Sequence, residues 1–196
     1  MARDAEKLIV PDFESYVSTR RDASGVRLLL DLIIYAGGLN LPQHIYEHPI
    51  LRRLRHDAAD IIAWAIVSPF PSPRAPSAHE RERARARRPQ DVAAYARHPH
   101  SCNLVTVLIA ERRFTPQGAV HFAGNLVKDT VANFRANEAA LPALGDGGGG
   151  DADARAYVRG LRDCVAGALH WLYETDRFFG AAGEDVRSSG WAFVSS

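Results

Sequence analysis

Apolar residues recur every three or four positions along most of this chain, and strict alternation of apolar and polar residues is almost absent. That spacing places apolar side chains on one face of an α-helix, whereas a half-buried strand requires a period of two. We therefore expect an all-α fold of five or six helices. The expected helices cover 20–37, 48–65, 104–109, 115–134 and 151–173.

Signals typical of helix ends support these boundaries. Gly37 ends the first expected helix, because glycine tolerates the left-handed conformation that follows a helix. Thr115 and Pro116 begin another, because a hydroxyl caps free N–H groups and proline needs no N–H donor in the first turn. Asp151 or Asp153 is expected to cap the last long helix.

Composition limits the classes of protein that the chain can be. Its 196 residues are 46% hydrophobic and 24% charged, with a formal net charge of +1, which fits one soluble domain. The arginine run at 81–88 has no interleaved aromatic residues, so it reads as a solvated charged loop and not as a nucleic-acid site. Two cysteines make no disulfide framework, and no segment has the roughly 20 apolar residues of a membrane helix. We expect a cytoplasmic protein with no nucleic-acid partner.

Residues 66–89 interrupt the helical pattern directly after Trp64 and Ala65. Prolines at positions 69, 71, 73, 76 and 89 exclude a continuous helix. Arginine and alanine are frequent in the rest of the stretch, as in GC-rich sequence read as coding. We expect 66–102 to be a disordered or aberrant insertion, such as a translated intron or a shifted reading frame. A second irregular segment, GDGGGGD at 145–151, is expected to be a flexible loop.

Four segments, in order along the chain, carry a resemblance to a known family. They are PDFESYVSTRRDASG (11–25), DLIIYAGGLNLPQHIYEHPILRRLRHDAADIIAWA (31–65), NLVTVLIAERRFTPQGAV (103–120) and LHWLYETDRFFG (169–180). Together they resemble class I terpene cyclases, specifically fungal sesquiterpene synthases. The resemblance implies that 1–196 is a single partial domain, similar to the C-terminal half of the isoprenoid synthase helical fold.

The resemblance implies the magnesium-dependent ionisation and cyclisation of farnesyl diphosphate, an isoprenyl diphosphate, with diphosphate as the leaving group. It assigns Arg21 to sensing the diphosphate, Ser24 to the link to a helix break, and the Gly25 carbonyl to triggering ionisation. It also assigns Arg177 to binding diphosphate, with Phe178 in place of the family's tyrosine. Arginine suits this ligand because its planar fork donates two hydrogen bonds at once and stays charged.

The resemblance further implies a magnesium site whose ligands this sequence supplies poorly. The family helix continues after Trp64 with asparagine, serine and glutamate at i, i+4 and i+8, on one helix face. The nearest later match, QDVAAYARH, places Gln90, Ala94 and His98 at these positions. An amide, a methyl group and an imidazole make a poor site for a cation that prefers carboxylate oxygen. The aspartate-rich motif of the family's earlier half does not occur in this sequence.

Three interpretations of the chain stay open. By resemblance it is a sesquiterpene synthase; alternatively it is a catalytically inactive fragment or splice product, or a helical partner-binding module with exposed apolar faces. From the residues alone, Arg21, Ser24 and Gly25 also fit an ordinary helix start. Arg177 also fits a helix C-terminus, where a cation complements the helix dipole. The product and the oligomeric state are left open.

Overall fold

The computed structural model describes residues 11–65, 104–144, 150–175 and 183–189, which form helices and their connections without any strand. The all-α expectation is therefore confirmed for the described part of the chain. The expected insertion at 66–102, and residues 145–149 of the expected loop, lie outside that part. None of the described helices is long and apolar enough to cross a membrane.

The described residues form eight helices, more than the five or six expected. They are α1 (Phe13–Ala23), α2 (Val26–Gly37), α3 (Gln43–Tyr46), α4 (Pro49–Ala65), α7 (Leu104–Arg112), α8 (Pro116–Ala139), α9 (Gly150–Glu174) and α10 (Gly183–Ser189). The cap expected for α8 is confirmed, because the Thr115 hydroxyl accepts a hydrogen bond from the Gly118 N–H at 3.1 Å. Helical periodicity thus located α4, α7, α8 and α9, and it missed α3 and α10.

The single helix expected over 20–37 is wrong. α1 ends at Ala23 and α2 begins at Val26, with Gly25 between them at φ 70°. A left-handed residue cannot continue a right-handed helix, and glycine adopts this conformation without steric cost. The apolar spacing continues across the break, so periodicity alone does not reveal it. A break beside Ser24 is, however, the feature that the family resemblance implied.

The start of α9 also differs from the expectation. The helix begins at Gly150, so Asp151 and Asp153 lie inside its first turn. The Asp151 carboxylate accepts hydrogen bonds from the Leu144 N–H at 3.0 Å and from Arg155 Nε at 2.9 Å. It ties the preceding chain to the helix start, where a negative charge complements the helix dipole.

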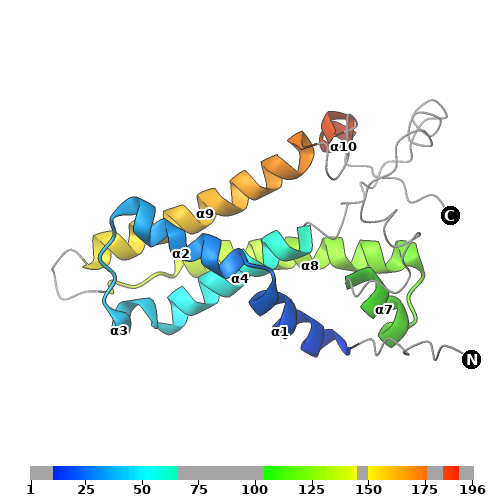
Figure 1. Ribbon diagram of the computed structural model, residues 1–196, viewed down its shortest axis with the longest axis horizontal. Coiled ribbons are helices and arrows are strands. Elements are labelled where there is room, and N and C mark those ends of the chain that lie inside the picture. Colours follow the sequence, from blue (N-terminus) through cyan, green and yellow to red (C-terminus); the bar gives the residue numbers. More distant parts are fainter. Residues whose placement is uncertain (1–10, 66–103, 145–149, 176–182, 190–196) are drawn as a thin grey trace, which may run out of the picture.

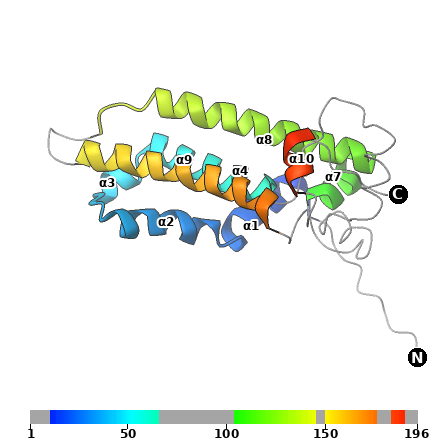
Figure 2. The ribbon, with the colours of Figure 1, turned by 90° about the horizontal axis from the view of Figure 1, so that it is seen from above.

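α4 lies at the centre of the described helices. It packs against α8 and α9 and also contacts α1, α2 and α3. Figure 2 shows α8 on one side of it and α2 on the other, and α9 runs along the bundle in both ribbon views (Figure 1). Fully buried side chains come from α2, α4, α7, α8 and α9: Leu30, Leu51, Leu54, Ile61, Leu104, Leu108, Val127, Tyr157 and Leu161. These five helices therefore build the hydrophobic core together.

α2 and α9 approach each other closely at one point. A Cβ built at Gly160 of α9 would lie 2.3 Å from Cγ2 of Ile33 on α2. Close-packed interiors have no room for such an overlap, so the approach requires glycine at this position.

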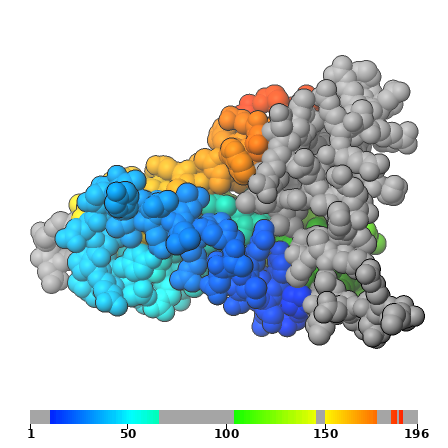
Figure 3. Space-filling model, viewed as in Figure 1, coloured from blue at the N-terminus to red at the C-terminus, as the bar shows by residue number. Residues whose placement is uncertain are grey.

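α2 is apolar on its outer face as well as its inner face. Val26 and Leu30 are buried, whereas Leu28, Leu32 and Tyr35 are 73%, 56% and 85% exposed. The helix forms a large part of the surface seen in Figure 3. The exposed apolar side chains therefore form a patch on this face of α2.

Candidate functional site

Arg21, in the last turn of α1, contacts Asp60 of α4 at two points. Arg21 Nε lies 2.7 Å from Asp60 Oδ1, and Arg21 Nη2 lies 2.5 Å from Asp60 Oδ2. The Asp60 side chain is 4% exposed and the Arg21 side chain is 35% exposed. The contact therefore joins two helices with the carboxylate inside and the guanidinium nearer the surface, and its two-point geometry fixes the orientation of the guanidinium.

Ser24 and Gly25 form the helix break just after Arg21. The Ser24 hydroxyl oxygen accepts a hydrogen bond from the Val26 N–H at 3.3 Å, and the Gly25 carbonyl accepts one from the Leu29 N–H at 3.3 Å. A carbonyl oxygen has two lone pairs, so this bond leaves one of them for a second partner. Arg21, Ser24 and Gly25 thus lie together at the junction of α1 and α2.

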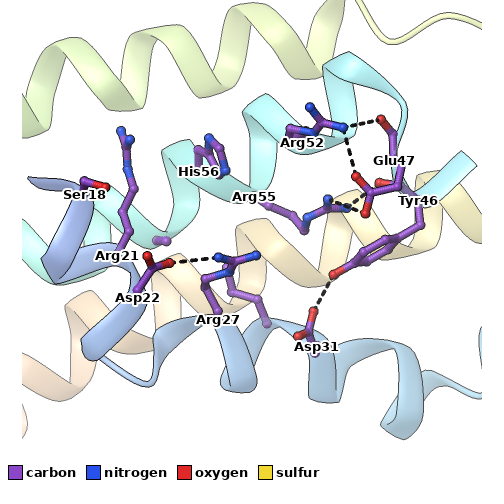
Figure 4. A pocket seen from close by; sticks show the side chains of 12 residues that line it. Ser18, Arg21, Asp22, Arg27, Asp31, Tyr46, Glu47, Arg52, Arg55 and His56 are labelled. Carbon is purple, nitrogen blue, oxygen red and sulfur yellow. Dashed lines mark hydrogen bonds and ion pairs between the residues drawn. The ribbon is translucent and has the colours of Figure 1, made fainter. Parts of the chain in front are cut away.

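A cavity of about 300 Å³ lies between α1, α2, α3 and α4. Figure 4 shows Arg21 at one end of it and Tyr46 at the other. Small-molecule pockets begin at roughly this volume, so the cavity suits a small ligand or the polar head of a larger one. Its lining includes four arginines and three carboxylates: Arg21, Arg27, Arg52, Arg55, Asp22, Asp31 and Glu47.

Three of these arginines pair with carboxylates of the cavity itself. Arg27 Nη1 lies 2.9 Å from Asp22 Oδ1, and Arg52 Nη2 lies 3.0 Å from Glu47 Oε2. Arg55 Nη2 lies 4.0 Å from Glu47 Oε1. An anion that entered this part of the cavity would have to compete with carboxylates already present.

Arg55 also contacts Tyr46, whereas the carboxylate partner of Arg21 lies outside the cavity lining. The Arg55 guanidinium covers the Tyr46 ring at 3.7 Å from its centroid, and Nη1 donates to the Tyr46 carbonyl. Arg21 alone of the four pairs with a carboxylate, Asp60, that does not line the cavity. Arg21 is therefore the cavity arginine that no carboxylate of the cavity lining holds.

The charges around Arg21 shift the pKa values of this region. The hydrogen bond with Asp60 raises the pKa of the Arg21 guanidinium above its usual value, so the group stays charged. Burial, and next the positive charge of Arg21, lowers the pKa of the His56 ring. Burial raises the pKa of the Asp57 carboxyl, against the hydrogen bond that it accepts from Asn137 Nδ2 at 3.0 Å.

Four expected site residues lie outside the described part of the chain. They are Arg177 and the positions at which the family places metal ligands, Gln90, Ala94 and His98. Among the described residues, no group of three or more histidine, cysteine, aspartate or glutamate side chains could hold a metal ion. The positions at which the resemblance places the magnesium ligands thus lie outside the ranges that the structure describes.

Sequence reasoning does not single out Asp60 or Arg20. Asp60 stands in a run of alanine and isoleucine, four positions before Trp64 and therefore at core-facing spacing. A carboxylate at such a position is the one signal in the sequence that indicates a buried ion pair. Nothing in the sequence marks Arg21 as its partner. Arg20, on the same helix end, has a buried Nε without a hydrogen-bond partner within the described ranges.

Comparison with known proteins finds similarity to terpene synthases. Residues 1–65 match the family model described as terpene synthase family 2, C-terminal metal binding, and the match ends at the last residue of α4. Sesquiterpene synthase Agr1 of Cyclocybe aegerita is 31% identical over 191 residues, which cover 96% of this chain and 48% of the relative. Alpha-muurolene synthase of Coprinopsis cinerea is 30% identical, over 95% of this chain and 38% of the relative. The chain thus spans about half the length, or less, of these curated relatives.

Solved structures share the fold over a similar part of their length. Germacradien-4-ol synthase from Streptomyces citricolor matches with a TM-score of 0.62 and 24% identity, over 82% of this chain and 46% of that chain. Wild-type cucumene synthase matches with a TM-score of 0.60 and 24% identity, over 86% and 51% respectively. The described helices therefore have the arrangement of about half of a terpene synthase fold.

Relatives along nearly the whole sequence and a shared helical fold point to one class: the chain is similar to terpene synthases. Among terpene synthases it is similar to the sesquiterpene synthases of fungi, at 30–31% identity to Agr1 and to sesquiterpene synthase 6 of Postia placenta.

Proposed function

We propose that the chain is the later half of a sesquiterpene synthase and acts on farnesyl diphosphate, which is ionised and cyclised with diphosphate as the leaving group. The curated relatives are named sesquiterpene synthases. The observation that carries the proposal is the position of Arg21, which lines the cavity and precedes the helix break at Gly25 by four residues. The cytoplasm is the proposed compartment, because the sequence has only two cysteines, in unlike contexts.

In this proposal Arg21 binds the diphosphate oxygens and stabilises the negative charge that grows as the carbon–oxygen bond breaks. A guanidinium held in place before the reaction stabilises such charge without reorganisation. The remaining lone pair of the Gly25 carbonyl can face the positive allyl carbon. Arg177 is a proposed second diphosphate contact, carried by the resemblance.

The resemblance assigns magnesium to this reaction, and the described residues provide no cluster for it. The contribution of the described residues is to bind and orient the diphosphate group.

The expected metal-ligand positions favour a second candidate, a catalytically inactive fragment or splice product. The positions at which the resemblance places metal ligands, Gln90, Ala94 and His98, supply poor ligands for magnesium, which favours loss of turnover.

Turnover separates the two candidates. The purified chain is incubated with farnesyl diphosphate and magnesium chloride, and volatile products are measured by gas chromatography and mass spectrometry. An active synthase gives a sesquiterpene that disappears in Arg21→Lys and persists in Arg159→Lys, which changes an exposed arginine of α9. A folded chain that gives no product identifies the inactive fragment.

Two glycines provide a matched test of the proposed trigger. Gly25 and Gly38 have φ values of 70° and 58°, and nothing lies within 4 Å of a Cβ built at either one. Each change to alanine should therefore cost a similar free energy of unfolding, about 1–2 kcal/mol for a left-handed residue. If Gly25 acts in ionisation, Gly25→Ala slows diphosphate release from farnesyl diphosphate much more than Gly38→Ala does. Equal rates would contradict the trigger role.

A further inference from the structure

The Arg21–Asp60 ion pair carries a further inference, which rests on the diphosphate-binding role proposed for Arg21. A carboxylate that is removed from water needs a charged or hydrogen-bonding partner, because it loses its hydration. Asp60 is 3% exposed, and both hydrogen bonds found for its carboxylate come from Arg21. Because the Asp60 carboxylate is buried, it depends on Arg21 for the hydrogen bonds that replace its hydration.

The contact uses only one edge of the guanidinium. Nε and one N–H of Nη2 point at the carboxylate. An arginine has five N–H donors, so three remain on Nη1 and Nη2. The Arg21 side chain is 35% exposed, which keeps part of it accessible to a ligand.

A carboxylate in this position can act on an incoming anion in two opposite ways. As a competing charge it lowers the affinity for the anion, and its removal strengthens binding. As a positioning group it fixes the guanidinium, and its removal weakens binding because the side chain must then be ordered when the ligand arrives. The two-point contact and the three free donors favour the second role.

We propose that Asp60 is a positioning residue for Arg21: its buried carboxylate holds one edge of the guanidinium so that the other edge can bind diphosphate at the end of α1. The other cavity arginines lack this arrangement, because their carboxylate partners line the cavity with them. Asp60 touches no substrate in this account and acts only through Arg21.

Calorimetric titration of the full chain with inorganic diphosphate tests the proposal. Asp60→Asn keeps the size of the side chain and removes the charge, so the diphosphate dissociation constant should rise about tenfold, as expected for a weakened charge-assisted contact. Asp163→Asn is the control, because Asp163 is an exposed carboxylate of α9 that does not line the cavity. It should change the dissociation constant little.

The background variant Arg21→Lys shows whether Asp60 acts through Arg21. In Arg21→Lys, adding Asp60→Asn should cause no further loss of affinity, whereas a general structural effect would add to it. Unchanged or tighter diphosphate binding by Asp60→Asn, with weak binding by Arg21→Lys, would overturn the positioning role and leave the proposed function intact. No binding by the wild-type chain, or equal binding by Arg21→Lys, would overturn the proposed function and the positioning role with it.

Circular dichroism checks that each variant is folded. If Asp60→Asn unfolds, Asp60→Glu takes its place, because it keeps the charge and moves it by one methylene. Weaker diphosphate binding by folded Asp60→Glu supports the proposal, and wild-type affinity contradicts it.

Discussion

Asp60 is almost fully buried whereas its partner Arg21 is one-third exposed, so the two ends of one ion pair lie in different surroundings. Removing Arg21 leaves an isolated carboxylate inside the protein, while removing Asp60 leaves a guanidinium that can turn toward water. We predict that Arg21→Ala lowers the free energy of unfolding by about 3 kcal/mol, the low end for a broken buried pair, and that Asp60→Ala lowers it by only about 1 kcal/mol. Urea denaturation measures both values.

The control for this asymmetry is the pair Arg27–Asp22, whose side chains are 63% and 68% exposed. Arg27→Ala should change the free energy of unfolding by less than about 1 kcal/mol. If Arg21→Ala costs no more than Arg27→Ala, the pair does not stabilise the contact between α1 and α4.

His56 reports the charge of Arg21. Its pKa is lowered by burial and then by Arg21, while Asp60 opposes the shift and Arg27 and Arg55 add to it. As pH falls, the unfolded chain therefore binds a proton at His56 before the folded chain does. The free energy of unfolding consequently decreases as pH drops below 6.5, the ordinary pKa of histidine.

We predict that the His56 pKa, measured by NMR titration of its ring protons, rises in Arg21→Gln. It should rise less in Arg27→Gln, because Arg27 contributes less to the shift. An unchanged His56 pKa in Arg21→Gln would show that Arg21 does not lie where the ion pair with Asp60 places it.

The close approach of α2 and α9 gives opposite predictions for two glycines of one helix. Gly160→Ala should lower the free energy of unfolding by about 1–3 kcal/mol, because its Cβ would overlap Ile33. Gly167→Ala should raise it by about 0.5–1 kcal/mol, because nothing lies within 4 Å of the new Cβ and alanine favours a helix interior. Thermal unfolding followed by circular dichroism measures both, and equal effects would contradict the packing of α9 on α2.

The outer face of α2 predicts self-association of the chain. A variant with Leu28→Glu, Leu32→Lys and Tyr35→Glu should stay monomeric at concentrations at which the wild type associates, with little change in melting temperature, because these side chains are exposed. Leu30→Lys, at a buried position of the same helix, should unfold the chain. Light scattering that finds the wild type monomeric at all concentrations would contradict this prediction.

The sequence predicted the elements whose signals are local. Thr115 caps α8 because a hydroxyl followed by proline specifies a helix start within a few residues. The break at Gly25 was hidden from periodicity, because apolar residues keep their spacing on both sides of it. Only the resemblance to a known family pointed to it.

The candidate site could be predicted only in part, for a physical reason. The resemblance to a known family assigned Arg21, but its partner Asp60 is 39 positions away, and the contact depends on how α1 docks on α4. The cavity likewise depends on four helices and on tertiary pairs such as Tyr46 with Arg55. Spacing along the chain carries no information about such docking.

A crystal structure of the full chain with inorganic diphosphate tests the central claim, that Arg21 is its diphosphate-binding residue. The account predicts a phosphate oxygen about 2.7–3.2 Å from a nitrogen of Arg21, with the Asp60 contact retained. Diphosphate bound at Arg20 or at Arg52, with Arg21 contacting Asp60 alone, would contradict it.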